Sequence, residues 1–255
     1  MKRQEDWRPS KFVTVNGRYR ASRDPKEVAP ASRLITDRLA VVYEEALRRH
    51  ARGALLDLGC GKVPLFGVYR SLVSDVTCVD WAARGEVSHL DLEVDLNQPL
   101  PLPDGEFDTV LATDVFEHVS DPRRVFREIS RLLRPGGTLI AGVPFLYWIH
   151  EEPHDYYRYT EFALRHLCTE NGLKVSSVES YGGAPEILFD TLAKTLSYGR
   201  LGTMVVGRWM TAGIMLLGQA CGGSAVGRRV SRATARTFPL GYCLIATKPG
   251  NASET

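Results

Sequence analysis

Apolar and polar residues alternate along this chain in blocks that predict strands separated by helices. Short apolar runs, typical of buried strands, begin at residue 54 and cover residues 75–80, 87–91, 107–113 and 138–143. Apolar residues recur at helical spacing over residues 32–50, before the first strand, and over 121–134, between two later strands. Asp121 and Pro122 favour the start of the second helix, and Pro135-Gly136-Gly137 its end. Strands that alternate with helices predict a Rossmann-like, doubly wound α/β sheet.

The C-terminal part adds two predicted strands, at 173–179 and 240–248, with a long insertion at 184–237 between them. The insertion contains an apolar helical stretch at 203–220, and no acid occurs from residue 191 to 253. A membrane-spanning helix is not predicted, because Arg208 interrupts the stretch and the uninterrupted run falls short of about 18 residues. Three interpretations stay open: a lid over a substrate, a homodimer interface, or a peripheral contact with anionic lipid. The unbalanced basic residues are Lys194, Arg200, Arg208, Arg228, Arg229, Arg232 and Arg236.

Residues 1–31 are polar and interrupted by prolines, which predicts an irregular arm ahead of a single domain at 32–255. A chain of 255 residues with 44% hydrophobic residues can bury a full core. Its formal charge of +2 gives no general reason to expect nucleic-acid binding. Five cysteines without metal-binding spacing fit a reducing compartment, and the N-terminus lacks the apolar core of a signal peptide. We therefore expect a cytoplasmic protein, with the inner face of a membrane as the alternative.

The segment ALLDLGCGK at 54–62 predicts a strand that leads into a ligand-binding glycine loop. Pro64 stands where a dinucleotide fingerprint needs its third glycine, and Val63 follows Lys62 where a P-loop needs Ser or Thr. Asp57, two residues before the first glycine, suits a ligand with a cationic amino group. Asp80 ends the next strand, where a carboxylate can accept both hydroxyls of a ribose; a helix cap or solvated turn is the alternative role.

Four linked blocks resemble the class I S-adenosylmethionine-dependent methyltransferase family: LLDLGCGK, VTCVDW, DLNQPLPLPDGEFDTVLATDVFEHV and RLLRPGGTLIAGVPF. The resemblance implies a sheet of about seven mostly parallel strands with an antiparallel last strand. It also implies S-adenosylmethionine as cofactor. By position, the family's contacts correspond to Asp57, Gly59, Cys60 and Gly61 at the methionine part, Asp80 at the ribose, Trp81, Asp95 and Leu96 at the adenine, and Asp114 near the reacting methyl group.

After the fifth predicted strand comes PFLYWIHEEPHDYYRYT at 144–160, where this family commonly places acceptor contacts. Similar HxxPHDYYRYT segments occur in one branch of the family. We expect His150 or His154 to be the general base, with Asp155 or Glu151 orienting it and Tyr157 or Arg158 holding a polar acceptor. The alternative is structural: an Asp155–Arg158 ion pair, packed aromatic rings, and hydrogen-bonded histidines.

Two other patterns favour no catalytic role. His150 to His154 spells HExxH, but Pro153 would break the helix that a zinc protease needs, so we expect no metal. Glu117-His118 follows the fourth strand, where polar residues more often fix a loop or border the methionine pocket.

The sequence therefore predicts methyl transfer from S-adenosylmethionine to a hydroxyl, or less favourably an amine, of a polar small molecule or sugar. Two alternatives come from other classes: a non-catalytic S-adenosylmethionine-binding module and an NAD-dependent oxidoreductase. The ionisable and aromatic residues of segment 144–160 argue against a non-catalytic module. Pro64 and Asp57 argue against an NAD-dependent oxidoreductase.

Overall fold

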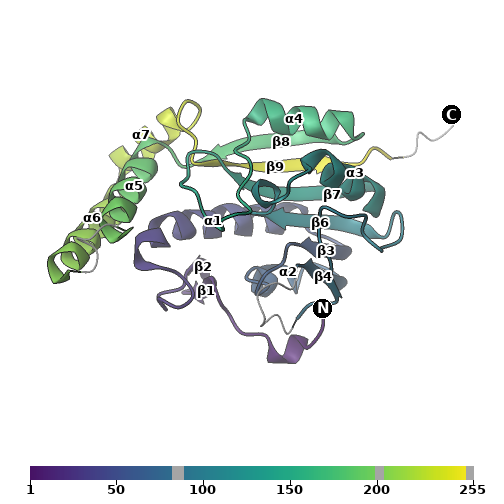
Figure 1. The fold of residues 1–255 in the computed structure, drawn as a ribbon, viewed down its shortest axis with the longest axis horizontal. Coiled ribbons are helices and arrows are strands. Elements are labelled where there is room, and N and C mark those ends of the chain that lie inside the picture. The colour runs from purple at the N-terminus through teal and green to yellow at the C-terminus, as the bar shows by residue number, and fades with distance from the viewer. Residues whose placement is uncertain (82–88, 199–203, 251–255) are drawn as a thin grey trace.

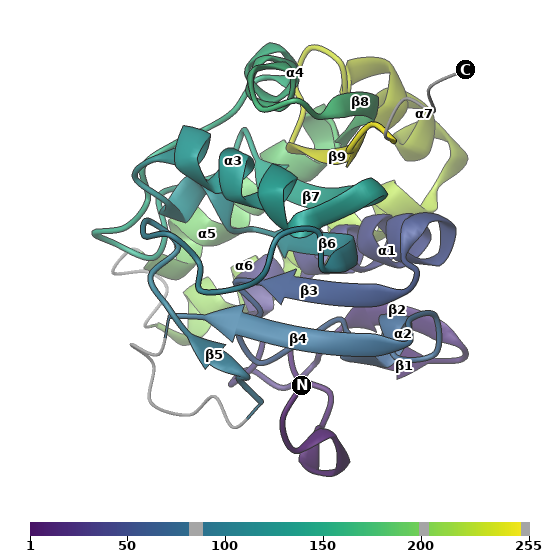
Figure 2. The same cartoon turned by 90° about the vertical axis from the view of Figure 1, so that its right-hand side faces the viewer.

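The computed structural model describes residues 1–81, 89–198 and 204–250. Within these residues seven strands form one sheet, in the order β5-β4-β3-β6-β7-β9-β8 (Figure 2). All pairs are parallel except those of β9, which runs antiparallel to β7 and β8. The predicted fold class is confirmed. The strands are β3 (Ala54–Leu58), β4 (Asp75–Asp80), β5 (Leu92–Glu93), β6 (Phe107–Thr113), β7 (Leu133–Pro144), β8 (Lys174–Tyr181) and β9 (Gly241–Thr247).

Helices cover both faces of the sheet (Figure 1). On one face, α3 and α4 contribute Phe126, Ile129 and Leu164 to a core cluster that includes Leu56 and Leu139. On the other, α1 and α2 bury their apolar sides against Leu55 and Ile140, which point the opposite way along the same strands. The helices are α1 (Arg33–His50), α2 (Phe66–Tyr69), α3 (Pro122–Leu132), α4 (Glu161–Glu170), α5 (Ala184–Tyr198), α6 (Val205–Gly223) and α7 (Ala225–Thr234).

Local sequence signals predicted β4 and β6 with the observed bounds. The α3 helix is capped as expected, because the Asp121 carboxylate accepts a hydrogen bond from the Arg124 amide at 3.2 Å. The strand predicted at 138–143 is longer, since β7 already begins at Leu133 and so includes Pro135-Gly136-Gly137. Of the strand predicted at 87–91, residues 87–88 lie outside the described residues, and 89–91 precede the short β5.

The expectation of an irregular N-terminal arm is wrong for residues 12–21. They form a hairpin of β1 (Phe12–Val15) and β2 (Arg18–Ala21), turned at Asn16-Gly17, both of which have positive φ. Phe12 and Tyr19 are buried against α1 and α2, so the hairpin belongs to the core. Short 3-10 turns at η1 (Gln4–Asp6) and η2 (Pro30–Ser32) complete this segment.

The insertion folds into α5, α6 and α7, gathered at one side of the sheet (Figure 1). Ala193 and Met215 pack with Ala31 and Leu34 in a separate small core. Elsewhere α6 exposes large apolar residues, namely Val205, Val206, Trp209, Met210, Leu216 and Leu217. Of the described helices, none combines the length and the apolar character that crossing a membrane requires.

Gly142 on β7 gives a test of the packing between the sheet and α1. A Cβ at this position would overlap the Tyr43 ring. We expect Gly142→Ala to lower the free energy of unfolding by about 1–3 kcal/mol, as overpacked cores do. Gly213→Ala on α6, where the added Cβ meets nothing within 4 Å, is the matched control and should stabilise by about 1 kcal/mol through helix propensity. Urea unfolding measures both, and equal stabilities would contradict the predicted overlap.

Candidate active site

The strand order reverses between β3 and β6, and the loops after these strands diverge there. A cavity of about 810 Å³ opens at this point, beyond the carboxyl ends of β3, β4 and β6. Its volume lies in the range typical of small-molecule sites.

The glycine loop after β3 leaves this cavity open on one side. Gly59 and Gly61 have φ of +70° and +53°, which side chains rarely adopt, and a Cβ on Gly61 would project into open space. The Gly61 amide donates to the Asp80 carboxylate at 2.5 Å, and the Trp81 amide donates to its other oxygen at 2.6 Å. Asp80 therefore faces the cavity with each oxygen held by one amide, which leaves lone pairs for a diol.

Asp57 is buried in the floor of the cavity. Its Oδ2 accepts a hydrogen bond from the Tyr69 hydroxyl at 2.7 Å. Burial raises the pKa of Asp57 to about 7, with a contribution from Asp80, although the Tyr69 hydrogen bond opposes the shift. A cationic ligand group beside Asp57 would compensate its buried charge.

Asp114 directly follows β6 and adopts the left-handed region, with φ of 56°. Its carboxylate accepts from the Tyr43 hydroxyl at 2.7 Å and pairs with the Lys11 ammonium at 3.0 Å. Burial opposes the Lys11 charge, but the Asp114 carboxylate outweighs it and raises the pKa of Lys11. Asp114 thus joins the N-terminal hairpin segment and α1 to the end of the central sheet.

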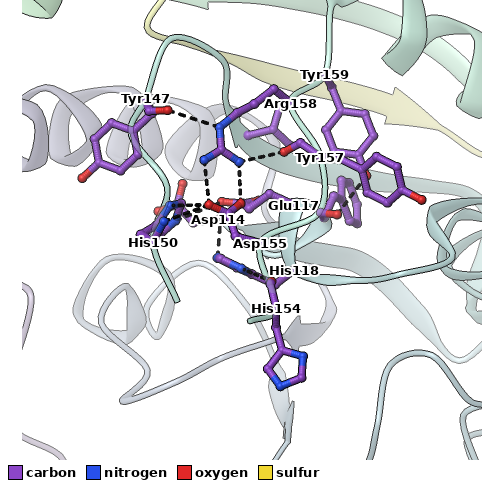
Figure 3. A network of polar contacts seen from close by, with 12 residues as sticks. Asp114, Glu117, His118, Tyr147, His150, His154, Asp155, Tyr157, Arg158 and Tyr159 are labelled. Atoms are coloured by element: carbon purple, nitrogen blue, oxygen red, sulfur yellow. Dashed lines mark hydrogen bonds and ion pairs between the residues drawn. The ribbon is translucent and has the colours of Figure 1, made fainter. Parts of the chain in front are cut away.

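Glu117, His118 and His150 converge on the wall beside Asp114 (Figure 3). Glu117 is fully buried; its Oε1 lies 3.7 Å from the His118 Nε2 and 3.9 Å from the His150 Nε2. Burial and the Asp114 charge raise the pKa of Glu117 well above its usual range, against the opposing effects of Arg158 and Lys11. Burial and His118 lower the pKa of His150, although Asp155 opposes this.

Asp155 and Arg158 form an ion pair in the loop that follows β7 (Figure 3). The guanidinium contacts both carboxylate oxygens, at 2.5 and 2.8 Å, and Asp155 also accepts from the His150 amide at 2.8 Å. Burial opposes ionisation of Asp155, but the Arg158 and His150 hydrogen bonds hold its pKa at about 2. Tyr157 donates its hydroxyl to the Ser120 carbonyl at 3.0 Å. These three side chains are engaged by protein groups and are not among the residues that line the cavity.

The other predicted site residues share the cavity wall. They are Asp57, Gly59, Cys60, Gly61, Asp80, Trp81, Asp95, Leu96, Asp114, His150, Glu151 and His154. The two histidines face different parts of it: the His154 ring lies 4.7 Å from the Trp81 ring, and Figure 3 shows it pointing away from the Glu117 cluster. Residues 150–154 are not helical, so the HExxH pattern has none of the geometry of a zinc protease.

Residues 56–141 match the sequence profile of the family described as "Methyltransferase domain". This region is a class I S-adenosylmethionine-dependent methyltransferase domain. The family suggested by the glycine loop and its linked blocks is thereby confirmed, while the HxxPHDYYRYT branch stays a prediction.

Relatives of the methyltransferase domain carry varied names. An uncharacterized 37.1 kDa protein in transposon TN4556 of Streptomyces fradiae is 33% identical over 52% of this chain and 43% of that protein. A ubiquinone biosynthesis O-methyltransferase of Caulobacter vibrioides is 35% identical over 47% of this chain and 56% of that protein. The 27-O-demethylrifamycin SV methyltransferase of Amycolatopsis mediterranei is 33% identical over 44% of each chain. This chain thus spans about half the length of these relatives.

Solved structures share the fold over most of the chain. The [4+2]-cyclase SpnF has a TM-score of 0.53 at 21% identity, covering 95% of this chain and 87% of that chain. The geranyl diphosphate C-methyltransferase of Streptomyces coelicolor has a TM-score of 0.51 at 16% identity, covering 89% and 84%. At such identities the likeness is one of fold alone.

The residues present fit the family's cofactor, S-adenosylmethionine. Asp57 can take its ammonium, the glycine loop leaves room for a close backbone approach, and Asp80 can accept the ribose hydroxyls. Trp81, 43% exposed, offers a ring face to the adenine.

Sequence reasoning missed Lys11 and Tyr43 in the cavity wall of the methyltransferase domain. Lys11 lay in the segment expected to be irregular, and Tyr43 fitted an ordinary apolar helix face. For Glu117 and His118 the sequence favoured a role in loop geometry or at the border of the methionine pocket, and both residues line the cavity. Their meeting with His150 depends on tertiary folding, for which local spacing carries no signal.

We expect Asp57 to make cofactor binding dependent on pH. Below about pH 7 its carboxyl becomes protonated and can no longer attract the ligand's ammonium, so the affinity for S-adenosylhomocysteine should fall by up to about tenfold per pH unit. Calorimetry between about pH 6 and 7.5 measures this slope. Asp57→Asn should bind more weakly and lose the acid-side slope, whereas Asp95→Asn should retain it. An unchanged slope in Asp57→Asn would assign the effect to another group.

Proposed function

We propose that this protein transfers a methyl group from S-adenosylmethionine to a hydroxyl, less favourably an amine, of a polar small molecule or sugar. The observation that carries the proposal is one continuous cavity, which joins the proposed adenosyl-binding loops to a wall formed by the buried Glu117 and the half-buried His118 and His150. A non-catalytic binding module would not need that second wall.

The chemistry requires alignment more than activation, because the sulfonium already makes the methyl group a good electrophile. The acceptor oxygen attacks the methyl carbon, the carbon–sulfur bond breaks, and sulfur keeps the electron pair as S-adenosylhomocysteine. Asp57 holds the ammonium of the methionine part and Asp80 the ribose hydroxyls, with Trp81, Asp95 and Leu96 at the adenine. The acceptor then lies toward Asp114 and Glu117.

A histidine of the loop after β7 receives the hydroxyl proton in this proposal. His150 is the better placed of the two candidates, because it lies beside Glu117 whereas His154 lies against Trp81 on the adenosine side. Asp155 and Arg158 act as positioning residues: the ion pair fixes the loop, and Asp155 holds the His150 backbone and lies 3.4 Å from its Nδ1. Tyr157 anchors the same loop to Ser120.

Relatives support oxygen as the acceptor atom to a limited extent. One of those described above is named as an O-methyltransferase, but a human thiol S-methyltransferase and a Rauvolfia serpentina N-methyltransferase also match, at 36% and 28% identity. The preference for oxygen therefore rests mainly on the wall at Glu117 and His150, which can accept a proton from a hydroxyl.

Ligand binding separates this function from its alternatives. Calorimetry should show binding of S-adenosylmethionine and S-adenosylhomocysteine and none of NAD. Formation of S-adenosylhomocysteine should then depend on a member of an acceptor panel of sugars, phenols and amines. Binding of NAD but of neither sulfur compound would refute the proposal, and cofactor binding with no turnover on a broad panel would favour the non-catalytic module.

Substitution of the histidines tests the proton-accepting role. We expect His150→Ala to lower kcat by about 10²- to 10⁴-fold, the usual contribution of a general base. His154→Ala should lower it less and mainly raise the KM for the cofactor. His166, an exposed histidine on α4, provides the control His166→Ala, which should leave both constants unchanged. An unchanged kcat in both His150→Ala and His154→Ala would show that neither of these two histidines accepts the proton.

A further inference from the structure

The carboxylate of Glu117 is an unusual group to bury. Its side chain has no exposed surface, and apart from its own backbone amide neither oxygen has a hydrogen-bond partner among the described residues. An unpaired carboxylate in a protein interior is costly, so such groups are usually neutralised by a proton, a cationic partner or a metal ion. In the cavity wall, the basic groups that lie beside the Glu117 carboxylate are the imidazoles of His118 and His150.

Both imidazoles direct a lone pair toward that carboxylate. The His118 Nδ1 lies 2.8 Å from the His154 carbonyl oxygen, which can only accept, so Nδ1 carries the hydrogen. The His150 Nδ1 lies 3.2 Å from the Trp148 carbonyl and 3.4 Å from Asp155, again two acceptors. In the neutral rings each Nε2 is therefore unprotonated. Histidines that ligate metal ions are commonly oriented in this way by the second ring nitrogen.

The separations suit an ion between the three groups. The distances of 3.7 and 3.9 Å from the Glu117 Oε1 to the two Nε2 atoms are too long for hydrogen bonds. Two ligand atoms that each lie about 2.1 Å from one ion are at most about 4.2 Å apart, so both distances fit. One ligand atom from each of the three residues lies within 4.8 Å of the others, and a small approach of the two rings completes the set.

We propose that Glu117, His118 and His150 bind a divalent transition-metal ion at the acceptor side of the cavity. Two imidazole nitrogens and one carboxylate oxygen suit Zn²⁺ or Mn²⁺ better than Ca²⁺, which prefers oxygen ligands throughout. Three protein ligands leave coordination positions open, as in catalytic sites, and all three residues line the cavity. This proposal replaces the expectation of no metal drawn from the sequence.

The ion deepens the proposed function, on which its catalytic role rests. An acceptor hydroxyl bound at an open position would lose its proton more readily, because a metal ion lowers the pKa of bound oxygen. The proton leaves to water in the cavity, the oxygen attacks the methyl carbon, and sulfur keeps the electron pair of the broken bond. His150 then serves as a ligand of the ion and is no longer the proton acceptor.

Metal binding is tested without donor or acceptor. After treatment with a chelator, calorimetric titration with Zn²⁺ and with Mn²⁺ should show one saturable site per chain for at least one ion. Glu117→Gln and His118→Asn should weaken metal binding at that site at least about tenfold. Asp155 acts through His150, so Asp155→Asn should weaken binding by about 10- to 100-fold. The control His166→Asn removes a surface histidine that pairs with Glu170 and should leave the affinity unchanged.

Thermal unfolding guards against loss of the fold as the cause. Glu117→Gln is nearly isosteric and removes a buried charge, so its metal-free Tm should equal or exceed that of the wild type, while added ion should raise only the wild-type Tm. Absence of a saturable site, or equal affinity in wild type and Glu117→Gln, overturns the metal site. Methyl transfer that persists without metal overturns the catalytic role of the ion but not its binding, whereas metal binding without any cofactor binding overturns the methyltransferase function.

Discussion

The burial of carboxylates at the ends of the central parallel strands is the constraint on which this structure depends. Asp57 lies in β3, and Asp114 and Glu117 follow β6, so folding of the sheet brings these acids to one cavity. Such charges repel one another and lose hydration. The partners that offset this come from different elements: Tyr69 from α2, Tyr43 from α1 and Lys11 from the hairpin segment. The site therefore also fixes how these elements pack on the sheet.

Much of the fold could be predicted because its signals are local. The continuous apolar runs of β4 and β6 and the Asp121 cap of α3 depend on neighbouring residues only. The hairpin at 12–21 was not predicted, because its signals are not local. Its strands have four residues each, and Phe12 and Tyr19 become core residues only through contact with α1 and α2, which lie elsewhere in the chain.

The two halves of the site differ in the same way. The proposed cofactor residues lie in the glycine loop and at the ends of successive strands, so their order in the chain predicts their place in the cavity. The acceptor side depends on His150 meeting Glu117 and His118 across two loops. The sequence of the loop is compatible with Asp155 and Arg158 either as acceptor contacts or as an ion pair. The folded structure shows that the Arg158 guanidinium donates its hydrogen bonds to Asp155 and to backbone carbonyls.

The insertion reaches the acceptor side indirectly. Among the described residues of 184–237 none lines the main cavity, but the Lys194 ammonium of α5 lies 3.8 Å from the ring centroid of Tyr147, which does. Lys194 also pairs with Asp190 at 2.7 Å, and both side chains are buried. Because both partners lie on α5, this pair fixes the Lys194 ammonium on the helix, and the contact of that ammonium with the Tyr147 ring joins α5 to the loop that carries His150. Because the matched methyltransferase profile ends at residue 141, that loop and α5 both lie beyond the profile, so the contact between them is a feature that the profile does not describe.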